Sequence, residues 1–150
     1  MAFNSLDEIL KQIIQWEKRL DTFYDMMEEY LTHKESRQTA EVLKRQQETA
    51  LKILNNIDIK QYEHIEFVKN IPDYRSKDVI PHFEISADSS PIEVSETILS
   101  YEEKLEEYYT HIRDVLTYTK SKDLFDMLIQ HKLGQIKEIK ALMDNYDLTV

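Results

Sequence analysis

Two glutamates of this chain lie in similar surroundings 85 residues apart (102 minus 17). Glu17 belongs to the stretch WEKRLDTFY (residues 16–24), and Glu102 belongs to YEEKLEEYY (residues 101–109). In both stretches an aromatic residue and a tyrosine follow the glutamate after nearly two helical turns. A carboxylate inside a protein is costly unless a cation or several hydrogen-bond donors meet it. Two such carboxylates therefore indicate either a metal site or an internal ion pair.

The offset of 85 also relates other residues on both sides of these glutamates. The matched pairs include Ser5 and Ser90, Glu8 and Glu93, Ile13 and Ile98, Leu20 and Leu105, Tyr24 and Tyr109, Leu31 and Leu116, Ser36 and Ser121, and Leu43 and Leu128. Similarity at a fixed offset indicates two copies of one structural unit. We predict two helical hairpins, over about residues 5–57 and 90–146, within a single domain 1–150.

Apolar residues recur at spacings of three and four, which predicts helices with one buried face. The predicted helices cover about residues 6–32, 37–56, 91–117 and 122–145. Between the hairpins lies a long connection, about residues 58–90, in which Lys60–Asn70 could form a short helix. The aromatics beside the buried faces, namely Trp16, Phe23, Tyr101 and Tyr108, are predicted to be packing residues.

Serines mark the predicted helix starts. The first helix of each hairpin begins with Ser-x-x-Glu, which fits a capping box, and Pro91 suits the first helical position. The second helix of each hairpin is also predicted to start at a serine cap. The four serines are Ser5, Ser36, Ser90 and Ser121.

Polar residues interrupt the buried stripes near the middle of each helix. They are Glu17, Gln47, Glu102, Lys132 and Gln135. Because the midpoints of antiparallel helices lie at the same level, we expect these side chains to converge in one polar layer inside a four-helix bundle.

This arrangement resembles the rubrerythrin branch of the ferritin-like superfamily, over four helices that make up about two thirds of the chain. The resemblance implies an all-α, ferritin-like four-helix bundle made of two repeated hairpins joined by a long crossover connection. In that family the first helix of each hairpin supplies a Glu and the second supplies Glu-x-x-His, and together they hold two iron ions.

Carried over position by position, the ligand set of that family is incomplete here. The six positions are Glu17, Gln47, Ala50, Glu102, Lys132 and Gln135. Only the two glutamates match, and a lysine stands where one ligand carboxylate is implied. We expect Lys132 to pair with Glu102 or Glu17, and the glutamines and two tyrosines to donate hydrogen bonds to the carboxylates. Such a layer would persist without metal.

We therefore predict a non-catalytic ferritin-like protein, with no cofactor, that acts as a structural or interaction module. The alternative is a rubrerythrin-type metalloprotein with an altered site for one or two iron or manganese ions and oxidase or peroxidase activity. The many Tyr and Ile of residues 57–85 could supply an apolar strip for a homo-oligomer, with a dimer favoured.

Composition excludes several other functions. A net charge of −10 disfavours nucleic acid and anionic membrane surfaces as partners. Without cysteine the chain has no thiol nucleophile. The N-terminal segment lacks the basic and apolar regions of a signal peptide, and no apolar run approaches the roughly 18 residues of a membrane span. We expect a cytoplasmic protein.

The histidines lack the spacing of a metal site. They are His33, His64, His82, His111 and His131, and no two are separated by four residues. We expect them at the surface or at the boundary of the core. Gly134 lies inside the last predicted helix, where glycine costs about 1 kcal/mol relative to alanine, and it either permits a close approach or is simply tolerated.

Overall fold

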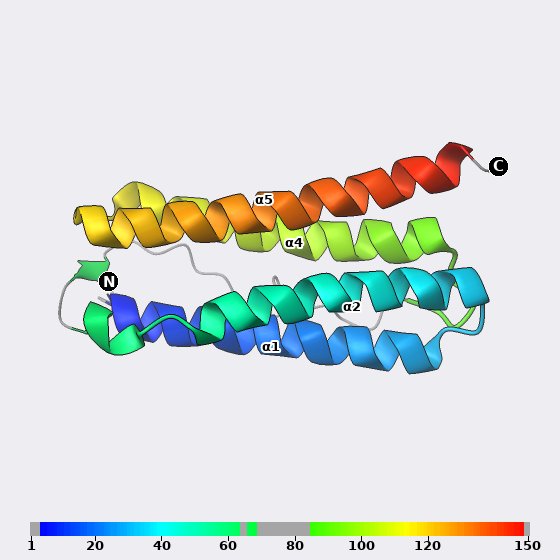
Figure 1. Cartoon of the computed structure of the whole chain (residues 1–150), viewed down its shortest axis with the longest axis horizontal. Coiled ribbons are helices and arrows are strands. Elements are labelled where there is room, and N and C mark those ends of the chain that lie inside the picture. Colours follow the sequence, from blue (N-terminus) through cyan, green and yellow to red (C-terminus); the bar gives the residue numbers. More distant parts are fainter. Residues whose placement is uncertain (1–3, 64–65, 69–84, 149–150) are drawn as a thin grey trace.

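Four long helices lie side by side in a computed structural model of the chain, which describes residues 4–63, 66–68 and 85–148 (Figure 1). They are α1 (Leu6–Tyr30), α2 (Lys34–Asn55), α4 (Pro91–Val115) and α5 (Thr119–Leu148). All four were predicted, with ends that differ by up to three residues. None of the helices in these ranges combines the length and apolarity needed to cross a membrane.

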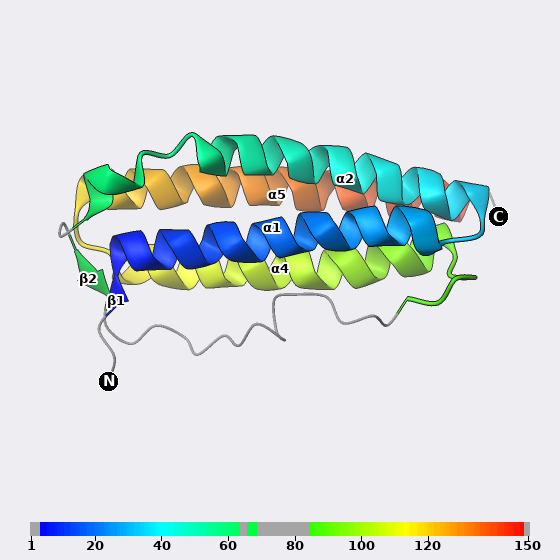
Figure 2. The same cartoon turned by 90° about the horizontal axis from the view of Figure 1, so that it is seen from below.

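The helices form two antiparallel hairpins that pack against each other. One consists of α1 and α2, with its turn at residues 31–33, and the other of α4 and α5, with its turn at residues 116–118 (Figures 1 and 2). α2 ends at the end of the bundle where α1 begins, whereas α4 begins at the opposite end (Figure 1). The four inward faces therefore share one core that runs the length of the bundle.

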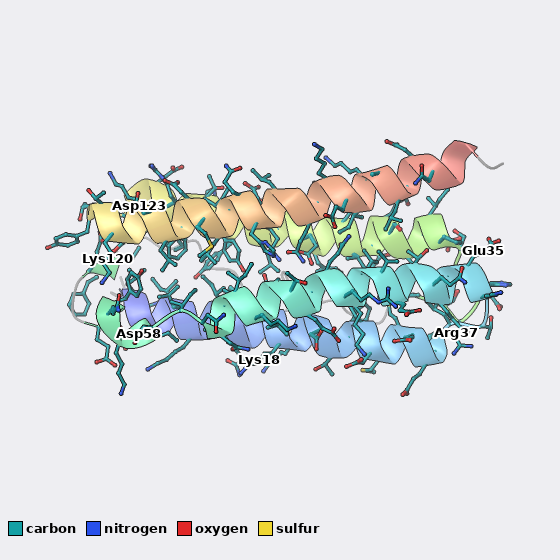
Figure 3. The ribbon with its side chains drawn as sticks, in the orientation of Figure 1. Lys18, Glu35, Arg37, Asp58, Lys120 and Asp123 are labelled. Atoms are coloured by element: carbon teal, nitrogen blue, oxygen red, sulfur yellow. The ribbon has the colours of Figure 1, made fainter. Side chains whose placement is uncertain are left out.

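The predicted stripes fill this core. Its buried apolar residues on the predicted stripes are Leu6, Leu10, Ile13, Leu20, Tyr24, Met27, Leu31, Ala40, Leu43, Ala50, Leu54, Ile98, Leu105, Tyr109, Ile112, Leu116, Phe125, Leu128 and Ile139. The flanking aromatics are also buried, and the rings of Trp16 and Tyr108 meet edge to face with centroids 5.1 Å apart. Charged side chains occupy the outer faces and the ends, as Lys18, Glu35, Arg37, Asp58, Lys120 and Asp123 show (Figure 3).

The first helix of each hairpin starts where its serine predicts. The hydroxyl of Ser90 accepts the backbone N–H of Glu93 at 3.1 Å, and Pro91 takes the first helical position of α4. Ser5 occupies the same position before α1, but its side chain makes no capping hydrogen bond. Only the serine half of the predicted capping box is therefore confirmed, and only in the second hairpin.

The predicted serine caps of the second helices are wrong. α2 begins at Lys34 and α5 at Thr119, so Ser36 and Ser121 lie inside the first turn and are fully buried. The hydroxyl of Ser36 instead donates to the backbone carbonyl of Ser89 at 2.6 Å. A tertiary contact with the segment before α4 has replaced the local cap.

The connection departs from the predicted short helix over residues 60–70. A single 3₁₀ turn, η1 (Ile59–Tyr62), is followed by strand β2 (Phe67–Val68), which pairs antiparallel with β1 (Asn4–Ser5). Pairing with the N-terminal residues holds β2 extended, so the helix prediction is wrong for this part. Residues 64–65 and 69–70 lie outside the described residues.

The histidines of the described chain lie outside the core. His33 and His111 are exposed, and His131 is half-buried at the boundary. The predictions for His64 and His82 lie outside the described residues, as does most of the predicted apolar strip in 57–85.

Candidate functional site

The polar interruptions of the four stripes meet in one layer inside the bundle, as predicted. We call this layer the buried ion cluster; its members are Glu17, Tyr24, Gln47, Glu102, Tyr109, Lys132 and Gln135, and each is at least 95% shielded from solvent. The remaining carried-over position is Ala50, which is buried and offers no polar side chain.

Lys132 lies at the centre of the buried ion cluster. Its Nζ is 2.6 Å from Glu17 Oε1 and 2.6 Å from Glu102 Oε2. The sequence predicted that Lys132 would pair with either Glu17 or Glu102, whereas its ammonium contacts both carboxylates. A single side chain from α5 therefore compensates carboxylates from α1 and α4.

Two tyrosines donate to the same carboxylates from the opposite hairpin. Tyr24 of α1 donates to Glu102 Oε1 of α4 at 2.8 Å, and Tyr109 of α4 donates to Glu17 Oε1 of α1 at 2.6 Å. Each tyrosine follows the glutamate of its own helix by seven residues, so its hydroxyl lies two turns away and reaches across the core. The prediction that the tyrosines donate to the carboxylates is confirmed.

The two glutamines serve different partners. Gln47 Nε2 donates to the Glu17 carboxylate and, at 2.9 Å, to the Glu17 main-chain carbonyl. Gln135 Nε2 donates to Gln47 Oε1 at 3.3 Å. The prediction that both glutamines donate to carboxylates is therefore wrong for Gln135, which supports the layer only through Gln47. The Gln135 Oε1 atom is buried with no hydrogen-bond partner.

Burial and charge act in opposite directions on Glu17. Burial alone would raise its pKa, because the charged form loses its hydration. The ammonium of Lys132 and hydrogen bonds from Lys132, a tyrosine and a glutamine outweigh burial and lower the pKa of Glu17. This carboxylate is therefore held in its charged form.

The Glu102 carboxylate has one hydrogen-bond donor fewer than Glu17, and its pKa shifts in the opposite direction. Burial raises its pKa, and the neighbouring charge of Glu17 adds to the rise, while Lys132 and Tyr24 offset only part of it. For Lys132, burial would lower the pKa, but the two carboxylates raise it. The lysine is therefore charged at neutral pH, and Glu102 is the member of the cluster that takes up a proton first.

These residues do not fit a di-iron centre. Such a centre places carboxylates and histidines from four helices around two iron ions. Here an ammonium lies at hydrogen-bond distance from both available carboxylates, where it would repel a metal cation. Among the described residues, no group of three or more His, Cys, Asp or Glu is placed to hold a metal ion.

A hollow on the surface between α2 and α5, next to the buried ion cluster, was not predicted from the sequence. Gln135, His131 and Gly134 from α5 and Gln46 from α2 line it. The only signal in the sequence was Gly134, which is the single glycine of the chain. A Cβ at this glycine would meet no atom within 4 Å, so the predicted alternative of a close approach is wrong.

Comparison of the chain with models of protein families, with curated proteins and with solved structures finds no match.

Replacing Lys132 by methionine tests the cluster. Removing one partner of a buried ion pair leaves uncompensated charge, so Lys132→Met should lower the free energy of unfolding by about 3–5 kcal/mol at pH 7. Because the pKa of Lys132 is raised above its usual 10.5, the contribution of the ammonium is complete below that pH and is lost as the pH rises through the folded-state pKa. The deficit of the variant should therefore shrink in strongly alkaline solution. Urea unfolding at a series of pH values measures both effects.

Lys44→Met is the matched control. Lys44 forms an ion pair with Asp25 on the surface of the bundle, where solvent screens the charges and the pair contributes little to stability. Equal losses from the two variants, or a deficit for Lys132→Met that does not change at high pH, would show that Lys132 is not a buried ammonium.

Proposed function

We propose that this protein is a rubrerythrin-like, ferritin-like bundle in which a lysine has replaced the metal centre, and that it acts as a non-catalytic structural or interaction module. The observation that carries the proposal is the position of Lys132 Nζ, in contact with both Glu17 and Glu102. A cytoplasmic location belongs to the same proposal.

The arrangement of the hairpins supports the architectural part of the proposal. Residues related by the offset of 85 take equivalent roles, since Tyr24 and Tyr109 donate to each other's glutamates. Gln47 and Lys132 are related by the same offset and both donate to Glu17. The end of α2 and the start of α4 lie at opposite ends of the bundle, which is the placement that a crossover connection requires (Figure 1).

The chemistry of the cluster supports a structural role. A lysine side chain is covalently attached, so the positive charge cannot dissociate as a bound metal can. Its charge also removes it as a nucleophile or general base, and Tyr24 and Tyr109 are kept in the phenol form because burial and the neighbouring carboxylates raise their pKa values. The layer thus fixes charge and hydrogen bonds without providing a reactive group.

Metal content tests this function directly. Protein purified from cells grown with added iron and manganese should contain well under one equivalent of either metal per chain, because the ammonium occupies the space between the carboxylates. Elemental analysis that found two equivalents per chain would support the rubrerythrin-type metalloprotein instead, and Glu17→Gln with Glu102→Gln should then abolish the binding.

Restoring the ligands of the resembled family tests the register, that is, whether the six ligand positions of that family have been matched to the correct residues of this chain. The variant Gln47→Glu, Ala50→His, Lys132→Glu and Gln135→His supplies both Glu-x-x-His pairs and should gain affinity for ferrous iron that the parent lacks. The matched control keeps the first three changes and leaves Gln135, so it lacks one histidine and should bind more weakly. If the full variant folds and binds no more iron than the parent, the register in which the six ligand positions were carried over is wrong.

A homodimer remains the expected assembly. Three exposed apolar residues lie near the α4–α5 turn, Phe67 (58% exposed), Val115 (44%) and Tyr118 (54%). The Glu66 carboxylate, beside Phe67, accepts the backbone N–H of Tyr118 at 3.5 Å, which places these residues at one end of the bundle. We propose this end patch as the contact surface, since neighbouring exposed apolar groups favour association.

Sedimentation equilibrium tests the dimer. The parent should sediment as a dimer, and replacing Phe67 and Tyr118 by serine should shift it toward monomer because apolar area is lost from the contact. Met26→Ser, at an exposed position on α1 away from the end patch, is the control and should leave the mass unchanged. A parent that is monomeric, or a double variant that remains dimeric, contradicts the proposal.

A further inference from the structure

The carboxylate of Glu66 holds the turn between α4 and α5. Glu66 is only 7% exposed, and its carboxylate accepts the backbone N–H of Thr117, the Thr117 hydroxyl at 2.8 Å and the backbone N–H of Tyr118 at 3.5 Å. These N–H groups lie directly before α5, where the helix dipole favours a negative charge. A residue of the connection therefore binds the turn of the second hairpin through its side chain.

The main chain of Glu66 is bound to the start of α1. The backbone N–H of Leu6 donates to the Glu66 carbonyl at 3.1 Å, and the next two residues form β2, which pairs with β1. Glu66 thus joins three segments that are far apart in the sequence, namely the start of α1, the connection and the α4–α5 turn.

The two hairpin turns are attached to the connection by different kinds of acceptor. Thr32 and Thr117 are related by the offset of 85 residues, and both the N–H and the hydroxyl of each donate to the connection. The acceptor for Thr32 is the backbone carbonyl of Ala87, which any residue would supply, whereas the acceptor for Thr117 is the Glu66 carboxylate. The attachment of the second turn therefore depends on one side chain.

The exposed apolar residues of the end patch flank this contact. Phe67 follows Glu66, Tyr118 follows Thr117, and Val115 is the last residue of α4. Phe67 and Val115 are 48 residues apart (115 minus 67), so only tertiary contacts can bring them together. The hydrogen bonds of Glu66 tie the segment that carries Phe67 to the turn that carries Tyr118.

We propose that Glu66 is a positioning residue of the homodimer contact, and that a second copy of the chain binds the end patch only when this carboxylate aligns Phe67 with Val115 and Tyr118. The inference rests on the end-patch dimer proposed above. Thr117 and Tyr118 are exposed, so water can replace a lost acceptor and the four-helix core does not require Glu66. Association should therefore depend on Glu66 more strongly than folding does.

Sedimentation of variants at residue 66 over a range of concentrations tests the inference. Glu66→Leu removes the acceptor, so the dissociation constant of the dimer should rise at least about tenfold. Glu66→Gln keeps one acceptor oxygen for Thr117 and should bind within about threefold of the parent. Both variants should unfold in urea near the midpoint of the parent. In Glu66→Leu the amides of Thr117 and Tyr118 should exchange hydrogen faster, because the turn is released.

Asp88→Leu is the matched control. The Asp88 carboxylate accepts the hydroxyl of Thr32 at 3.2 Å, at the end of the bundle opposite the end patch (Figure 1). This variant makes the same change in net charge as Glu66→Leu and also removes an acceptor from a hairpin turn. It should leave the dissociation constant of the dimer unchanged.

The outcomes distinguish the role of Glu66 from the existence of the dimer. A parent that is monomeric contradicts the dimer and, with it, this role of Glu66. A dimeric parent whose dissociation constant is the same in Glu66→Leu contradicts the role of Glu66 alone. Equal weakening by Glu66→Leu and Asp88→Leu, equal weakening by Glu66→Leu and Glu66→Gln, or loss of folding in Glu66→Leu would also overturn the inference.

Discussion

The balance of charge among Glu17, Glu102 and Lys132 is the constraint on which the rest of the bundle depends. All three side chains are at least 98% buried, and none can be left without its partners at low cost. Because successive residues of a helix point about 100° apart, a shift of one residue in α5 would turn the ammonium away from both carboxylates. The buried ion cluster therefore fixes the rotation of α5 about its own axis and its position along the bundle relative to α1 and α4.

The hydrogen bonds around this centre join the two hairpins more specifically than apolar packing can. Tyr24 and Tyr109 each cross from one hairpin to a carboxylate of the other, and Gln47 secures Glu17 from its own hairpin. An apolar core of similar volume could match or exceed this stability, but leucine and isoleucine tolerate several registers. We infer that the polar layer mainly determines which arrangement of the four helices forms.

The sequence predicts those features that local spacing determines. The helices, their buried stripes and the polar layer follow from spacings of three and four. The partners of Glu17 follow because polar side chains near the midpoints of antiparallel helices lie at the same height in the bundle. Features that depend on distant segments were missed: Ser36 bonds the segment before α4, and β2 pairs with the N-terminal residues. The hollow at Gly134 was missed because it depends on the spacing between two helices.

The central claim is tested most directly by a crystal structure with anomalous diffraction data. The protein should be produced in cells grown with added iron and manganese and crystallised in the presence of both metals. The account predicts no anomalous peak between Glu17 and Glu102, and continuous density placing the Lys132 ammonium against both carboxylates. A metal peak bridging the two glutamates, with Lys132 displaced from them, would contradict it.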